Sequence, residues 1–184
     1  EDAYALSTLS SGSSRRSTTS GENLSPIVIA HVNTRIDQPK IHRMKVLLDS
    51  GASATIINKK HVRHLKILPS AKTTWTTKAG TFTTSDKCKI KFTLPEFYEH
   101  RVVEWTVHVD DFEGHNKYDM IIGRDLLETL GFTLNFNDKT IIWDGATAPM
   151  KSQEFLNRPL ANSGNNFYWH EDLYKTAAVQ SATE

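Results

Sequence analysis

Two runs of strict alternation between apolar and polar side chains, within residues 88–109, constrain this chain most strongly. Every second position is apolar in both runs: Cys88, Ile90, Phe92 and Leu94, then Val103, Trp105, Val107 and Val109. Successive side chains of a strand point to opposite faces, so a period of two predicts strands that bury one face. A chain with two such strands has to build a sheet around them.

Shorter β-branched and apolar runs on either side extend this pattern. They cover residues 27–32, 44–48, 55–57, 118–122, 132–136 and 140–143. Helix signals are brief. Asn58 suits the cap of a short helix that stops near Pro69, and residues 125–130 form two turns closed by Gly131. Many short strands with one or two short helices predict an all-β barrel or sandwich.

The two ends of the chain lack this rhythm. Eleven of the first 25 residues are Ser or Thr, and the few apolar residues there cannot offset the chain entropy lost on folding. Near the other end, aromatic residues are scattered among Asn, Ser and Gly. We therefore expect a flexible linker at residues 1–25, one domain at 26–148 and a second linker at 149–184.

Composition excludes several classes of protein. The 22 Lys and Arg nearly balance the 21 Asp and Glu, which argues against a chain whose main work is coating nucleic acid. One cysteine excludes an internal disulfide framework or a multi-cysteine zinc module and favours a reducing compartment. Apolar runs are too short to span a bilayer. The chain begins at Glu1 without a leader pattern, so we expect a piece of something longer.

The clearest chemical signal is Asp49-Ser50-Gly51, which follows the apolar run 46–48. Ser50 places a hydroxyl beside the carboxylate, and Gly51 allows a close backbone approach that a Cβ would block. The tripeptide alone is better interpreted as a surface turn. Here apolar residues precede it and Ala-Ser-Ala-Thr-Ile-Ile follows it, which indicates a buried Asp with a functional reason to be there.

Two further features are commonplace when each is taken alone. The first is a hairpin tip at residues 78–81, with Ala79 and Gly80 at its centre. The second is the apolar pair at 121–122, which leads through a glycine into a short apolar helix. Either feature alone indicates nothing more than ordinary β structure.

Together, in this order and at these spacings, the three features resemble retropepsins, the aspartic proteases of retroviruses and LTR retrotransposons. The family pattern is an apolar strand into D-[S/T]-G-A, a Gly-tipped flap, then two apolar residues, Gly, Arg, Asp or Asn, and a helix. The resemblance covers residues 26–148, and residues 139–144 look most like the gypsy-type retrotransposon branch. It implies an all-β, closed, retropepsin-like barrel with one or two short helices that works as a homodimer.

The resemblance also implies a role for each motif residue. The implied roles are catalysis by Asp49, an active-site loop of Ser50, Gly51 and Ala52, a flap tip at Ala79 and Gly80, and loop support by Ile121, Ile122, Gly123 and Arg124. The flap would cover bound peptide and exclude water. Lentiviral members pair such an Arg with an Asp where this chain has Ser53, so the partner of Arg124 stays open.

Peptide hydrolysis by carboxylates needs two of them, one to activate water and one to protonate the carbonyl oxygen. Two close carboxylates share a proton because both cannot ionise easily. The chain has one Asp-Ser-Gly, and Asp144-Gly145 lacks both the intervening residue and the buried strand. We therefore predict an obligate homodimer in which each chain supplies Asp49. We expect a peptide or polyprotein substrate, no metal, no cofactor, no membrane and no direct nucleic acid partner.

Other candidate residues have simpler interpretations. His61 and His64 could share a helix face, but without a third ligand a solvated face is a better interpretation than zinc binding. The basic run at 59–66 is interpreted as solvated rather than as a contact with viral RNA. Cys88 sits in an alternating strand and is interpreted as core filler.

The function expected from the sequence is an aspartic endopeptidase that processes a retrotransposon Gag-Pol polyprotein, in the cytoplasm and within virus-like particles. Two alternatives stay open. One is an inactive retropepsin-fold module for dimerisation or peptide binding. The other is a trimeric dUTPase-like all-β enzyme, although its Arg-Ser-Gly loop and its Gly-rich, Arg-bearing tail are missing here.

Overall fold

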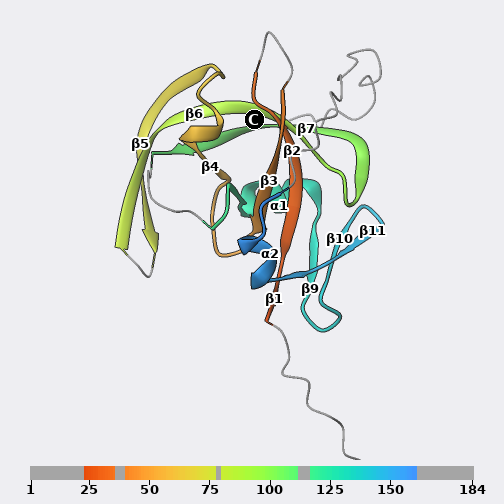
Figure 1. Cartoon of the computed structure of the whole chain (residues 1–184). Helices are drawn as coiled ribbons and strands as arrows, with labels where there is room; N and C mark the ends of the chain where they lie inside the picture. The colour runs from red at the N-terminus through yellow and green to blue at the C-terminus, as the bar shows by residue number, and fades with distance from the viewer. Residues whose placement is uncertain (1–22, 36–39, 78–79, 112–116, 161–184) are drawn as a thin grey trace, which may run out of the picture.

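The computed structural model describes residues 23–35, 40–77, 80–111 and 117–160 (Figure 1). The described elements are mostly strands, with one 3-10 helix and two short α-helices. In chain order they are β1 (Leu24–Ser25), β2 (Ile27–Asn33), β3 (Ile41–Leu48), β4 (Ile56–Asn58), η1 (Lys59–His61), β5 (Ile67–Thr77), β6 (Gly80–Leu94), β7 (Tyr98–Asp110), β8 (Met120–Ile122), α1 (Arg124–Leu130), β9 (Thr133–Asn135), β10 (Thr140–Trp143), β11 (Ala146–Pro149), β12 (Lys151–Ser152) and α2 (Gln153–Asn157).

Six strands close into a barrel in the order β2-β3-β8-β4-β7-β6. The ring closes because β6 pairs with β7 along most of its length and with β2 at residues 91–93. The β3–β8 and β4–β7 pairs are parallel, and the other pairs of the ring are antiparallel. β5 extends the sheet outward as a long hairpin with β6 (Figure 1). The predicted all-β closed barrel with few helices is confirmed.

The core lies inside this ring and follows the period of two. On β3, Met44, Val46 and Leu48 are buried, while the residues between them face outward and are half-buried. The alternating apolar residues of β6 and β7 are also buried, as the sequence predicted, except that Trp105 is half-buried. Cys88 is fully buried, and burial raises the pKa of its thiol to about 11. Cys88 is therefore a packing residue of the core and not a thiolate nucleophile.

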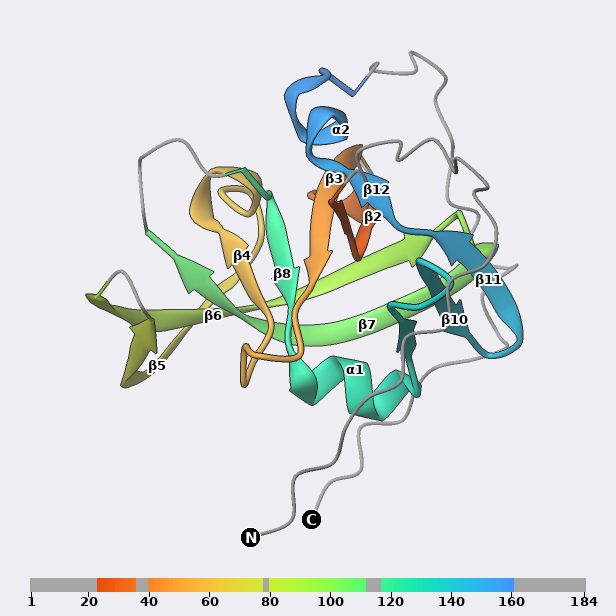
Figure 2. The same cartoon turned by 90° about the horizontal axis from the view of Figure 1, so that it is seen from below.

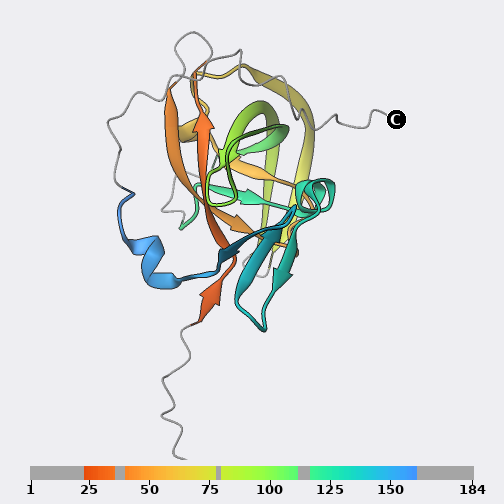
Figure 3. The same cartoon turned by 90° about the vertical axis from the view of Figure 1, so that its right-hand side faces the viewer.

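The segments around the barrel form two smaller units. β9, β10 and β11 make a three-stranded sheet beside it (Figure 3), where the rings of Phe132 and Trp143 stack at 5.3 Å. β1 pairs with β12, so residue 24 meets residue 152. Lys151 Nζ donates to the Ile27 carbonyl at 3.0 Å and fixes this pair to the barrel. The part of the expected C-terminal linker that is described therefore contains β12 and α2, and the limits of the domain stay predictions.

Three predictions about helix ends had different outcomes. Gly131 ends α1 in the left-handed region at φ 72°, as predicted. Asn58 does accept a capping bond, from the Lys60 amide at 3.0 Å, but the helix it caps is one 3-10 turn. The expected stop at Pro69 is wrong, because this proline lies inside β5. An edge strand tolerates proline, and the register with β6 shifts just beyond it.

Candidate active site

Asp49 lies at the point where β3 leaves the barrel. Its backbone N–H donates to the Ile122 carbonyl of β8 at 2.9 Å, which holds the strand end in place. Its carboxylate Oδ1 accepts from the Gly51 N–H at 2.8 Å. The side chain is half-buried, and Ser50 and Gly51 are exposed. The predicted catalytic residue is therefore presented on a tight turn at the barrel's end, with its carboxylate oriented by the backbone.

Gly123 lets the chain segment after β8 touch the loop after Asp49. A Cβ at this position would lie 2.4 Å from the Ala54 carbonyl oxygen and 2.5 Å from its carbon, both backbone atoms. The next residue donates its backbone N–H to the Ala52 carbonyl at 2.8 Å. This close approach, and not an unusual φ, is the reason for glycine at this site.

Asp125 ties the loop to two other elements, a role that the sequence interpretation missed. Its Oδ1 accepts from the Thr55 hydroxyl at 2.8 Å, and its Oδ2 accepts from the Thr55 N–H at 3.1 Å and from Trp105 Nε1 at 3.2 Å. The Thr55 hydroxyl oxygen in turn accepts from the Gly123 N–H at 3.2 Å. The start of α1 (Figure 2) is thereby joined to the active-site loop and to β7.

The other residues expected to support the loop occupy different positions. Ile121 and Ile122 pair in parallel with Leu47 and Leu48, so they lie alongside the strand that carries Asp49. Ile122 is fully buried. The Arg124 side chain is exposed, and within the described ranges it makes no hydrogen bond or ion pair. Its contact with the loop runs through its backbone N–H alone.

The predicted flap corresponds to the β5–β6 hairpin, which extends from the barrel. Gly80 begins β6, and Ala79 lies outside the described residues. In the half of the hairpin toward its tip, Trp75 Nε1 donates to the Thr84 hydroxyl at 2.9 Å, and that hydroxyl lies 3.2 Å from His108 Nδ1 on β7. The Trp75 and His108 rings meet edge to face at 4.8 Å. Burial, together with the charge of Lys87, lowers the pKa of His108, and the charge of Asp125 opposes this.

His61 also has a different environment from the one expected. Its Nε2 lies 2.9 Å from Asp119 Oδ1, and only 18% of the side chain is exposed, so the expected solvated face is wrong for this residue. Asp119 Oδ2 accepts from the Lys45 N–H at 2.9 Å. Burial alone would raise the pKa of Asp119, but the His61 and Lys45 hydrogen bonds and the charges of His61 and Lys60 lower it overall. Lys45, His61 and Asp119 lie far apart in the sequence, so the spacing of motifs gave no signal for these contacts.

Two further observations concern metal sites and membrane-spanning helices. Among the described residues, no group of three or more His, Cys, Asp or Glu is placed to hold a metal ion. In the same part of the chain, none of the helices has the length and apolar character needed to cross a bilayer.

Comparisons with known proteins add three findings. A family model described as "Aspartyl protease" matches residues 32–126, just over half of the chain. Among solved structures, the chain is similar to the retroviral protease-like domain of Ddi1 from Leishmania major, with 16% identity, 71% of this chain and 96% of that chain covered, and a TM-score of 0.49. It is also similar to EIAV protease complexed with the inhibitor HBY-793, with 23% identity, coverages of 65% and 100%, and a TM-score of 0.43. No curated protein matches the chain.

Proposed function

The chain belongs to the aspartyl protease family, and from this premise we propose that it is an aspartic endopeptidase of the retropepsin type whose active site needs two chains. The observation that carries the proposal is the position of Asp49. Its carboxylate stands on a fixed turn at the end of a barrel strand, within the residues that match the family. Family membership also argues against the dUTPase-like alternative.

The proposed chemistry follows from two Asp49 carboxylates placed side by side. At short range both cannot ionise easily, so the pair holds one proton and titrates as a unit. The ionised carboxylate takes a proton from water, which attacks the peptide carbon. The protonated one donates its proton to the carbonyl oxygen. As the C–N bond then breaks, the proton taken from water passes to the leaving nitrogen. A hydroxyl proton of the tetrahedral intermediate returns to the second carboxylate, which leaves the free acid and restores the singly protonated pair.

The loop contacts give this chemistry a rigid base. Gly51 orients one oxygen of Asp49, and the bonds from Asp125 to Thr55 hold the segment that follows. Preorganised groups lower the barrier because they need not rearrange during the reaction. In the proposal, Ser50 bonds across the two chains, and the hairpin tip with Ala79 and Gly80 closes over the peptide. Arg124 and its neighbours 121–123 support the loop from below.

The proposed biological role is the processing of a Gag-Pol polyprotein of a gypsy-type retrotransposon, in the cytoplasm and within virus-like particles. What supports it is the match of residues 139–144 to that branch and the Ser/Thr-rich segment before the domain. Mass spectrometry of the fragments formed when a longer Gag-Pol polypeptide is expressed would identify both the cleavage sites and the processed ends.

The direct test of the activity is cleavage of a peptide library by the wild-type chain and by Asp49→Asn and Asp49→Ala. Both variants should lose pepstatin-sensitive cleavage while keeping the fold and the dimer. Asp144→Asn is the matched control, because Asp144 also precedes a glycine but its carboxylate bonds to Arg101 on the surface at 2.6 Å. Retained cleavage by either Asp49 variant, or active material that stays monomeric in ultracentrifugation, would contradict the proposal. A folded, dimeric wild-type chain without cleavage would instead favour the inactive binding module.

A further inference from the structure

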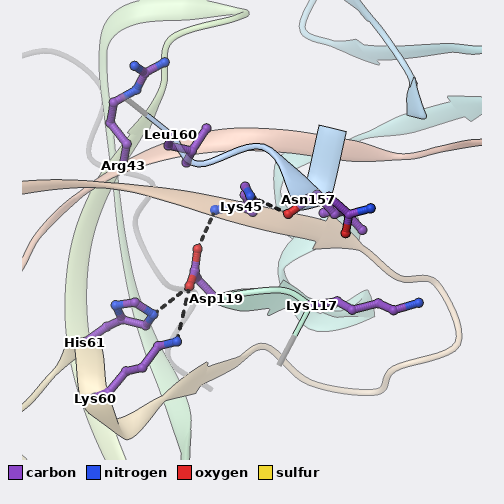
Figure 4. A pocket seen from close by; sticks show the side chains of 9 residues that line it. Arg43, Lys45, Lys60, His61, Lys117, Asp119, Asn157 and Leu160 are labelled. Atoms are coloured by element: carbon purple, nitrogen blue, oxygen red, sulfur yellow. Dashed lines mark hydrogen bonds and ion pairs between the residues drawn. The ribbon is translucent and has the colours of Figure 1, made fainter. Parts of the chain in front are cut away.

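A concave region lies on the outside of the barrel, and Asp49 is not among the residues that line it. It has a volume of about 620 Å³ and is formed by the outer face of β3, by η1, by the start of β8 and by the end of α2 (Figure 4). We call it the basic hollow. Its lining residues are Arg43, Lys45, Lys60, His61, Lys117, Asp119, Leu156, Asn157 and Leu160.

Charge in the basic hollow is strongly one-sided. Four of its residues are Lys or Arg, and the one carboxylate among them is Asp119. Both oxygens of that carboxylate are already engaged, Oδ2 by the Lys45 N–H and Oδ1 by His61. Lys60 Nζ is 3.7 Å from Oδ1, a long contact with about half of the side chain exposed. Asp119 therefore organises the hollow and leaves it with an excess of positive charge.

Positive charge continues beyond the hollow along the barrel end. His42 lies next to Arg43 on β3. Burial lowers the pKa of His42, and the charges of Lys40, His61 and Arg35 lower it further. Several cations therefore act on the same part of the molecule. The charged lining residues sum to 4 − 1 = +3, and the whole chain has a net charge of +1, so the other residues of the chain sum to −2. The expectation of no nucleic acid partner rested on the total charge and did not consider this asymmetry.

We propose that the basic hollow binds the phosphate backbone of a nucleic acid without sequence preference. The side chains of Arg43 and Lys117 point away from Asp119 toward opposite ends of the hollow (Figure 4). Cations that spread along an open surface match an extended polyanion, whereas a single phosphate needs donors that converge. Lys45 is not counted among the phosphate contacts, because its Nζ donates to the Leu156 and Arg158 carbonyls. Arg43 is not counted either, since it already interacts within the chain. About two phosphate contacts then come from Lys60 and Lys117.

Two features of the hollow disfavour an acidic peptide as its occupant. β3 pairs with β8 only at residues 46–48, but both backbone groups of Lys45 are already bonded to Asp119, so the backbone at Lys45 cannot accept an added strand. The apolar lining is limited to Leu156 and Leu160, which offers little anchorage for side chains. The one aromatic ring in the lining is the His61 imidazole, which is held by Asp119, so we expect contacts with the phosphate backbone and not base stacking.

The test is fluorescence anisotropy with a labelled single-stranded RNA of about 20 nucleotides, titrated with the full chain. Two phosphate contacts predict that the logarithm of the binding constant falls with the logarithm of salt concentration with a slope of about −1.4. Charge reversal in Lys60→Glu/Lys117→Glu should weaken binding at low salt about tenfold or more and reduce the slope. The neutral double variant Lys60→Gln/Lys117→Gln should lose less affinity for the RNA. It checks that the effect of charge reversal does not come from misfolding.

The matched control is Lys72→Glu/Lys89→Glu, which makes the same change in net charge at exposed residues of β5 and β6 that do not line the hollow. It should retain most of the affinity. Three results would overturn the proposal: no binding by the wild-type chain at about 50 mM salt, equal losses in the hollow and control variants, or displacement of the RNA by polyglutamate as readily as by unlabelled RNA. Because binding does not require Asp49, these results are independent of the protease proposal.

Discussion

Asp125 connects three parts of the molecule through one carboxylate. It accepts three hydrogen bonds, two from Thr55 and one from Trp105, and these residues are 70 and 20 positions away. A carboxylate is suited to this position because it offers several acceptor sites and no donor when ionised. The interaction is part-buried, so losing it leaves donors near the active-site loop without a partner.

We predict that Asp125→Ala lowers the free energy of unfolding by about 2–4 kcal/mol, because three donors lose a charged acceptor. Urea denaturation followed by tryptophan fluorescence measures the change. Glu128→Ala is the control, since Glu128 is exposed on the same helix and should change stability by less than about 0.5 kcal/mol. Equal effects of the two substitutions would mean that the Asp125 bonds contribute nothing beyond helix propensity.

Gly123→Ala should be more damaging than its size suggests. The added methyl would meet the Ala54 backbone at 2.4 Å, and a backbone cannot yield without moving the loop that carries Asp49. We expect a loss of about 3 kcal/mol and reduced cleavage. Gly131→Ala is the matched control: it has open space around it and costs only the strain of φ 72°, about 1 kcal/mol. If thermal denaturation shows the same loss in both, the close approach is not important.

Asp119 gives a prediction about acid stability. Its pKa is lower in the folded chain than the ordinary value of 3.8, so the folded state favours the ionised form. The resulting stabilisation is complete above the unfolded pKa and disappears as the pH falls through the folded pKa. The stability difference between wild type and Asp119→Asn should therefore shrink as the pH is lowered below about 4. Urea titrations across this range measure it, and a difference independent of pH would refute the assignment.

At the scale of elements, β12 and α2 hold the end of the described chain against the barrel. Lys151 bonds to the Ile27 carbonyl at 3.0 Å and to the Glu96 carboxylate at 2.5 Å. Lys45 Nζ donates to carbonyls at the end of α2, an arrangement that suits a cation at a helix C-terminus. Met150 and Leu156 are buried by these contacts.

Truncation separates this segment from the residues that follow it. A chain ending at Leu160 should be as stable as the full chain. A chain ending at Pro149 loses the buried Met150 and Leu156 side chains and should be less stable by about 3–5 kcal/mol. Chemical denaturation of the two truncated chains makes the comparison. Equal stability would show that the domain ends near residue 148, where the sequence pattern first suggested.

The same elements show what sequence can and cannot predict. The strands of β6 and β7 were predictable because alternation records burial on one face within each strand. β12 was not predictable, because it is two residues long and exists only through pairing with β1 more than a hundred residues earlier. A local motif was enough to propose Asp49 as the catalytic residue, which stays a prediction, whereas the contacts of Asp125, His61 and Asp119 arise from folding and leave no trace in spacing.

At the scale of the whole molecule, the central claim is that the barrel is half of an enzyme. One chain supplies one Asp-Ser-Gly, and the proposed chemistry needs two carboxylates that share a proton. The other conspicuous Asp-Gly, at Asp144, is in a surface ion pair with Arg101. A second chain related by a two-fold axis is the simplest source of the second carboxylate.

The most direct test mixes wild-type chains with a ninefold excess of Asp49→Asn chains and measures peptide cleavage per wild-type chain. If the site takes one Asp49 from each chain, about nine in ten wild-type chains enter mixed dimers that lack one carboxylate. Total activity then follows the square of the wild-type fraction, so activity per wild-type chain follows the fraction itself and should fall to about one tenth. Activity that stays proportional to the amount of wild-type chain would contradict the shared site.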